Sequence, residues 1–127
     1  MKVLILDDDA ISRATIASMC ERAGLDALET GDRQTAQATL TAEQSGIELV
    51  ILNWPLAGTG GLGELRGTMS PAKIRGIPVL MLYIEATCTS EFLKASIVAG
   101  ATHHLAKPFD LREFRQKVAE VRAATEA

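Results

Sequence analysis

Four polar side chains that could together bind a cation or an anion follow short apolar stretches of this chain. The stretches at residues 3–6, 49–52 and 104–106 hold three or four residues each, which is too few for a helix. Apolar runs of this length are typical of strands buried on both faces of a parallel sheet. Because such strands end at one shared crevice, we expect the polar side chains that follow them to meet there. They are Asp7, Asp8, Asn53 and Lys107.

The first run ends in consecutive carboxylates. Carboxylates held together repel one another, and a divalent cation or a lysine normally relieves that cost. Asp7 and Asp8 are therefore candidate magnesium ligands, and Lys107 is expected to pair with one of them. Asp9 is interpreted as the N-cap of the next helix, because aspartate there accepts backbone N–H groups and suits the positive end of the helix dipole. For Asp8 the same capping role is the alternative.

Strand and helix signals alternate five times along the chain. This pattern predicts an α/β fold in which helices cover both faces of a parallel sheet. Strands are expected near residues 2–6, 26–30, 49–52, 78–83 and 103–106. Helices are expected near residues 10–23, 33–44, 61–69, 89–99 and 111–124. Because no repeat or linker interrupts this pattern, residues 1–127 are predicted to form a single domain.

Local signals mark several ends of the predicted helices. Gly24 and Gly100 lie just past two of them, where a left-handed backbone conformation favours glycine. Asp110 and Glu113, three residues apart, predict a capping box at the start of the last helix. One apolar face predicts that this helix docks on the sheet. Its residues are Leu111, Phe114, Val118 and Val121.

Size and charge limit the functions that the chain can have. Its 127 residues are 47% hydrophobic, enough for a packed core without disulfides or a structural metal. The net charge of -3 and the pI near 5.4 leave no basic footprint, so no direct nucleic-acid partner is expected. Cys20 and Cys88 are interpreted as reduced thiols, which favours a cytoplasmic setting. No apolar run suits a secretory signal or a membrane span, so no membrane partner is expected.

The strand-end residues resemble the receiver domain of two-component response regulators, and the resemblance extends from Lys2 to about Val121. It implies a flavodoxin-like (βα)5 fold, a doubly wound parallel five-stranded sheet with strand order 2-1-3-4-5. In that family an acidic pair after the first strand helps to hold magnesium, and an aspartate after the third strand is phosphorylated. A lysine before a cis-proline contacts the phosphoryl group. The corresponding residues here are Asp7 with Asp8, Asn53, and Lys107 before Pro108.

Asn53 departs from the family pattern, because it stands where the resemblance places the phosphoacceptor. Phosphorylation there needs a carboxylate oxygen that attacks phosphorus, and an amide oxygen is uncharged. We therefore expect no acyl phosphate at Asn53. The missing negative charge should also weaken magnesium binding, so Mg2+ is a possible but weak ligand. An ordinary turn residue after a strand is the alternative interpretation of Asn53.

Two further positions of the family pattern are also altered. Tyr83 matches a serine or threonine that contacts the phosphoryl group, and its longer side chain should either fill that space or turn away. A tyrosine that simply packs on a neighbouring helix is the alternative. His104 matches an aromatic switch position, where imidazole is smaller and can carry charge near neutral pH. His103 and His104 should not chelate one ion, since adjacent strand residues point to opposite faces.

The loop after Asn53 matches a further family ligand. A main-chain carbonyl two residues beyond the phosphoacceptor binds the metal, which corresponds to Pro55, and proline keeps its carbonyl. The glycines of this loop lack the lysine and the spacing of a phosphate-binding loop, so they are interpreted as turn residues. They are Gly58, Gly60 and Gly61.

We therefore expect a receiver-like protein-interaction module of two-component signalling that is not phosphorylated and is not an enzyme. The resemblance implies a signalling partner such as a histidine kinase, an output domain or another regulator. This partner would bind the face made by the fourth helix, the fifth strand and the fifth helix. Residues on that face would include Phe92, Lys94, His104 and Arg112.

Two alternative functions stay open. The first is an ordinary phosphorelay receiver whose acceptor has moved to a neighbouring carboxylate such as Asp8. The second is a flavodoxin-like protein that binds a small molecule. The aspartates after the first strand disfavour the second alternative, because they would repel a phosphate group.

Overall fold

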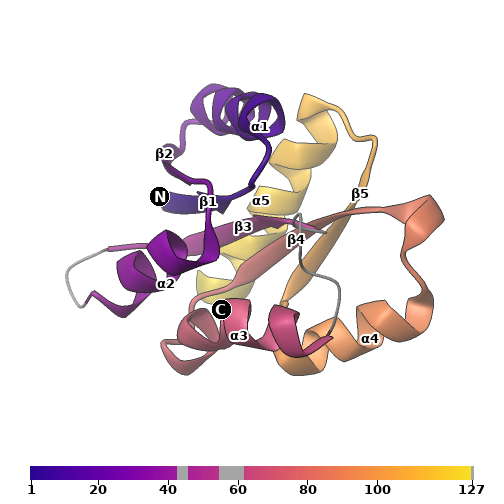
Figure 1. Ribbon diagram of the computed structural model, residues 1–127. Coiled ribbons are helices and arrows are strands. Elements are labelled where there is room, and N and C mark those ends of the chain that lie inside the picture. The colour runs from indigo at the N-terminus through magenta and orange to yellow at the C-terminus, as the bar shows by residue number, and fades with distance from the viewer. Residues whose placement is uncertain (43–45, 55–61, 127) are drawn as a thin grey trace.

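The computed structural model describes residues 1–42, 46–54 and 62–126, which form a sheet flanked by helices (Figure 1). The strands are β1 (Lys2–Leu6), β2 (Asp26–Thr30), β3 (Leu49–Asn53), β4 (Val79–Ile84) and β5 (His103–Lys107). The helices are α1 (Ala10–Arg22), α2 (Arg33–Thr41), α3 (Leu62–Ile74), α4 (Ser90–Ala99) and α5 (Leu111–Glu126). A short 3-10 helix, η1 (Glu85–Thr87), follows β4 and was not predicted. Within these ranges, no helix combines the length and apolar character that a membrane crossing requires.

The strands pair in parallel in the order β2-β1-β3-β4-β5, which confirms the predicted flavodoxin-like topology. Helices α1 and α5 cover one face of the sheet, and α2, α3 and α4 cover the other (Figure 1). The strand order reverses between β1 and β3, which lie side by side. At such a switch point the connections leave in opposite directions and open a crevice at the carboxyl ends of the strands.

The central strands supply two apolar layers. Val3 and Ile5 of β1 belong to the cluster under α1 and α5, whereas Leu4 and Leu6 belong to the cluster under α2, α3 and α4. Every residue of β3 is buried, as expected for a strand covered by helices on both sides. The residue at the end of β3, Asn53, is therefore held at a well-fixed position.

Two helix boundaries differ from the prediction. Helix α2 ends at Thr41 rather than near residue 44. Helix α3 continues to Ile74, past the predicted end near residue 69, and contains Pro71. Proline cannot donate to the carbonyl four residues earlier, that of Gly67. Gln37 of α2 donates to that carbonyl from Nε2 at 2.7 Å, which explains how the helix runs through the proline.

The predicted N-cap Asp9 is present, and of the predicted capping box the structure shows the hydrogen bond to the Asp110 side chain. Oδ2 of Asp9 accepts from the amide of Ser12 at 2.8 Å, and Oδ1 of Asp110 accepts from the amide of Glu113 at 2.8 Å. Gly24 and Gly100 have φ angles of 76° and 133°, which suit glycine. On α5 the fully buried part of the docking face is shorter than predicted, because Phe114, Val118 and Val121 are buried whereas Leu111 is only partly buried.

Candidate functional site

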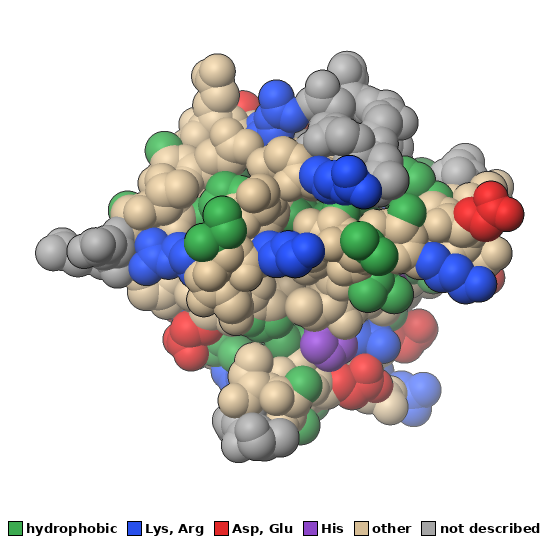
Figure 2. Space-filling view, turned by 90° about the horizontal axis from the view of Figure 1, so that it is seen from below, with side chains coloured by type: hydrophobic (Ala, Val, Ile, Leu, Met, Phe, Trp, Pro, Cys, Tyr) green, Lys and Arg blue, Asp and Glu red, His purple; other side chains and the backbone are tan. Residues whose placement is uncertain are grey.

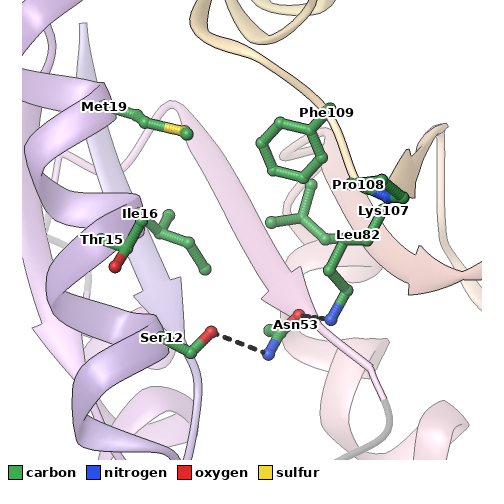
Figure 3. Close-up of a pocket in the computed structure, with 9 residues that line it drawn as sticks. All are labelled: Ser12, Thr15, Ile16, Met19, Asn53, Leu82, Lys107, Pro108 and Phe109. Atoms are coloured by element: carbon green, nitrogen blue, oxygen red, sulfur yellow. Dashed lines mark hydrogen bonds between the residues drawn. The ribbon is translucent and has the colours of Figure 1, made fainter.

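The carboxyl ends of β1, β3 and β5 bring Asp7, Asn53 and Lys107 together. Lys107 donates a hydrogen bond from Nζ to Oδ1 of Asn53 (Figure 3). On its other side Asn53 donates from Nδ2 to Oγ of Ser12 in α1, at 3.3 Å. Only 8% of Asn53 is exposed. The carboxamide therefore connects the end of β5 to α1, with its oxygen facing the ammonium group.

The hydrogen bond of Lys107 differs from the predicted pairing with Asp7 or Asp8. The acceptor is the side-chain oxygen Oδ1 of Asn53, which lies at the end of β3 within reach of Nζ. Burial lowers the pKa of Lys107, and the negative charge of Asp7 acts in the opposite direction. The acid thus influences the lysine through its charge, while the neutral amide provides the contact.

The carboxylate of Asp7 is fully buried directly after β1. Its Oδ1 accepts from the amide of Asp9 at 3.0 Å. Its Oδ2 has no hydrogen-bond partner among the described residues. A buried carboxylate oxygen without a partner is costly, so this atom is the natural ligand for a cation. Asp8, in contrast, is exposed beside it.

Tyr83 and His104 contact each other. Their rings form an edge-to-face pair with centroids 6.2 Å apart and planes at 77°. Tyr83 also packs on the apolar cluster under α2, α3 and α4, and it is not among the described residues that line the cavity at Asn53. Its ring therefore turns toward His104, which is the second of the two predicted orientations. Burial, followed by the charges of His103 and Lys117, lowers the pKa of His104, which favours the neutral ring.

A cavity of about 330 Å3 opens from this site between α1 and the segment after β5. Figure 3 shows Ile16 and Met19 on one side, Phe109 and Leu82 on the other, and Asn53 at the end. We call it the α1–Phe109 cavity. Its lining residues are Ser12, Thr15, Ile16, Met19, Asn53, Leu82, Lys107, Pro108 and Phe109.

Sequence reasoning missed Ser12 and the apolar walls of this cavity. The sequence offered one usable signal, since Ser12 is the third residue of α1 and so points to the same strand edge as the aspartates before it. Pro55, whose carbonyl is the predicted backbone ligand, and the glycines at 58, 60 and 61 lie outside the described residues. Among the residues that are described, no group of three or more His, Cys, Asp or Glu side chains could hold a metal.

A doubly wound sheet of this order, with acid, amide and lysine at one switch point, defines a flavodoxin-like α/β protein of the receiver type. A family model, the response regulator receiver domain, matches residues 3–119. The chain belongs to this family, which confirms the resemblance seen in the sequence.

Individual relatives agree with this assignment. The chain is 32% identical over 111 residues to the phosphate regulon transcriptional regulatory protein PhoB of Pseudomonas aeruginosa, covering 87% of this chain and 47% of PhoB. It is 26% identical over 122 residues to the chemotaxis protein CheY of the same organism, covering 95% of each. The chain thus spans about half of the first relative and nearly all of the second.

A solved structure has the same fold. The receiver domain of the sensor histidine kinase PA1611 from Pseudomonas aeruginosa PAO1, with a magnesium ion coordinated in its active site cleft, superimposes with a TM-score of 0.76. The two chains are 18% identical, and the match covers 96% of this chain and 97% of the other. At this identity the likeness shows the fold alone.

Proposed function

We propose that this receiver domain acts as a protein-interaction module without phosphoryl transfer to the end of β3. One observation carries the proposal, namely that a buried asparagine, Asn53, stands at that end and accepts a hydrogen bond from Lys107. Attack on phosphorus requires a negatively charged oxygen whose charge the surroundings stabilise. The Asn53 oxygen is uncharged and already engaged, so it lacks the reactivity that the step needs.

The residues present fit a magnesium ion only in part. Asp7 offers a buried carboxylate oxygen without a described partner, and Asp8 is exposed next to it. Magnesium favours carboxylate oxygens and keeps several waters, so these two side chains would hold it. A bound ion would neutralise negative charge at this edge. Because Asn53 contributes no charge, we propose weak binding.

The proposed partner surface is the face of α4, β5 and α5. Lys94 of α4 and Arg112 of α5 are exposed, as this role requires. Phe92 is less suitable than predicted, because it is half-buried and its ring stacks on Trp54 with centroids 6.2 Å apart. Ile97 lies three residues after Lys94 on the same helix and is 56% exposed, so we propose it in place of Phe92 as the apolar contact.

The side of the molecule covered by α3 and α4 carries other exposed apolar groups. Ile74 and Val98 are 82% and 65% exposed. Figure 2 shows that apolar side chains on this side are interspersed with Lys and Arg rather than gathered into one patch. Such a mixed surface suits a regulated partner better than a permanent one, which needs a more continuous apolar contact.

Mass spectrometry of the intact protein tests the absence of phosphorylation. After incubation with acetyl phosphate and Mg2+, we expect an unchanged mass. Asn53→Asp, which restores the carboxylate, should gain one phosphoryl group, whereas the neutral control Asn53→Ser at the same position should gain none at an aspartate. A phosphoryl group mapped to any aspartate of the unmodified chain would contradict the proposal.

The exposed carboxylate of Asp8 supports one alternative, an ordinary phosphorelay receiver that uses this residue as acceptor. It predicts an acid- and hydroxylamine-labile phosphate that disappears in Asp8→Ala. Asp9→Ala serves as the matched control, because Asp9 is exposed at the next position and caps α1. Labelling that survives Asp9→Ala and is lost in Asp8→Ala would select this alternative.

A further inference from the structure

The α1–Phe109 cavity has an apolar body and a polar end. Ile16, Met19, Leu82 and Phe109 form its walls, and these side chains face one another across the opening (Figure 3). Ser12, Asn53 and Lys107 lie at the polar end. Small-molecule sites commonly combine apolar walls with a few convergent polar groups. The arrangement therefore suits a ligand with one polar head and one apolar tail.

The polar end selects the charge of the head. Lys107 is the one charged side chain among the described residues that line the cavity. An ammonium group has three N–H donors, and one of them goes to Asn53. Lys107 thus retains donors for a ligand, whereas Oδ1 of Asn53 and Oγ of Ser12 are already accepting. A ligand head that accepts hydrogen bonds and carries negative charge would complement this end.

The surroundings limit that charge to a single unit. Asp7 lies close enough to Lys107 to influence its pKa. A polyanion such as a nucleotide would meet this carboxylate with only one cation to offset the repulsion. A carboxylate, with one charge and two acceptor oxygens, makes the smaller demand.

We propose that the α1–Phe109 cavity binds an amphipathic monocarboxylate, with its head on Lys107 and its apolar chain between Met19 and Phe109. A water molecule occupies about 30 Å3 in the liquid, so a cavity of about 330 Å3 holds about ten non-hydrogen atoms. Octanoate has that number. This site goes beyond the proposed interaction role, and it rests on the proposed absence of a phosphoryl group at the end of β3, because such a group would compete for Lys107.

An NMR titration of the 15N-labelled chain with sodium octanoate tests the site. We expect saturable shifts at residues that line the cavity, including the amides of Met19 and Phe109. Butyrate lacks most of the tail and octylammonium inverts the charge of the head, so each should bind at least about tenfold more weakly. An absence of saturable shifts with octanoate, or equal shifts with octylammonium, would overturn the proposal.

Two variants locate the head and the tail. Lys107→Gln should weaken octanoate binding by about tenfold or more, because a charge-assisted hydrogen bond is lost. Arg66→Gln, which removes an exposed positive charge from α3, is the matched control and should leave binding unchanged. Met19→Trp should abolish binding by filling the apolar end, and it keeps the site testable if Lys107→Gln fails to fold by circular dichroism. Undiminished binding in either cavity variant refutes the assignment.

Discussion

Nε2 of His104 and Oγ of Ser96 share a hydrogen bond of 2.8 Å. The Ser96 hydroxyl also lies 2.6 Å from the carbonyl of Leu93, which can only accept, so donation from Nε2 to Oγ is the arrangement that satisfies both contacts. Ser96 is fully buried in α4, and His104 belongs to β5. This hydrogen bond therefore ties α4 to the edge of the sheet.

We predict that stability falls in mild acid because of His104. Its pKa lies below the ordinary value of 6.5, through burial first and then the charges of His103 and Lys117. Below pH 6.5 the unfolded chain then binds more protons than the folded chain. The contribution is complete above pH 6.5 and is lost as the pH falls through 6.5 toward the folded-state pKa. Urea unfolding between about pH 5 and pH 8 measures the free energy of unfolding, and an NMR titration of the ring measures the pKa of His104.

His103 must be separated from this effect, because burial and the charge of Lys117 also lower its pKa. His104→Phe should remove part of the pH dependence, and His103→Gln should remove a further part. A measured pKa of His104 above 6.5, or an unchanged slope in His104→Phe, would show that the assignment is wrong.

A second prediction concerns magnesium. Asn53→Asp adds a carboxylate beside the buried acid Asp7, so the affinity for Mg2+ should rise by about tenfold or more. Trp54, the single tryptophan of the chain, follows Asn53 directly, and its fluorescence reports the titration. Asn53→Ser is the neutral control and should keep the weak affinity. Equal affinity in all three proteins would mean that the end of β3 does not contribute to the metal site.

The fold could be predicted from the sequence, and so could the residues that meet at the ends of the strands. Strand ends in a parallel sheet depend on the pattern of apolar runs, so Asp7, Asn53 and Lys107 could be placed together before any geometry was known. The partners of these side chains could not be predicted. Lys107 could have paired with the carboxylate of Asp7 or with the side-chain amide of Asn53. Which of the two it contacts depends on rotamers and packing, which cannot be deduced from the spacing of residues in the sequence.

Contacts distant in sequence explain the remaining differences. The predicted end of α3 near residue 69 lies before Pro71, and the donation from Gln37 to Gly67 explains why the helix continues through the proline. Leu111 matched the apolar period of α5, yet its position at the first turn leaves it at the margin of the core. Periodicity identifies the face of a helix but not how far the core extends under it.

The contact between Gln37 and Gly67 supplies a third prediction. Gln37→Ala should lower the free energy of unfolding by about 1 kcal/mol, since a carbonyl next to Pro71 loses its donor. Gln34→Ala, at an exposed position of the same helix, should change it by less than about 0.5 kcal/mol. Denaturant titration measures both variants.

A double-mutant cycle gives this contact a stricter test. Pro71→Ala restores a backbone donor to the carbonyl of Gly67, so the cost of Gln37→Ala should shrink in that background. Equal costs in the two backgrounds would show that the glutamine does not compensate for the proline.

The last prediction tests the extent of the core under α5. Phe114 is fully buried and stacks on Phe109 with ring centroids 6.1 Å apart, whereas Leu111 is only partly buried. Phe114→Ala should cost about 3–5 kcal/mol, a large share of the about 5–15 kcal/mol that stabilises a typical domain. Leu111→Ala should cost less, about 1–2 kcal/mol, because the side chain is only partly buried at the first turn of α5. Phe114→Leu provides a milder variant if the alanine protein does not fold. Urea unfolding measures the loss of stability in each variant. Similar losses for the Leu111 and Phe114 substitutions would mean that the fully buried face of α5 begins at Leu111, as the sequence predicted, and not at Phe114.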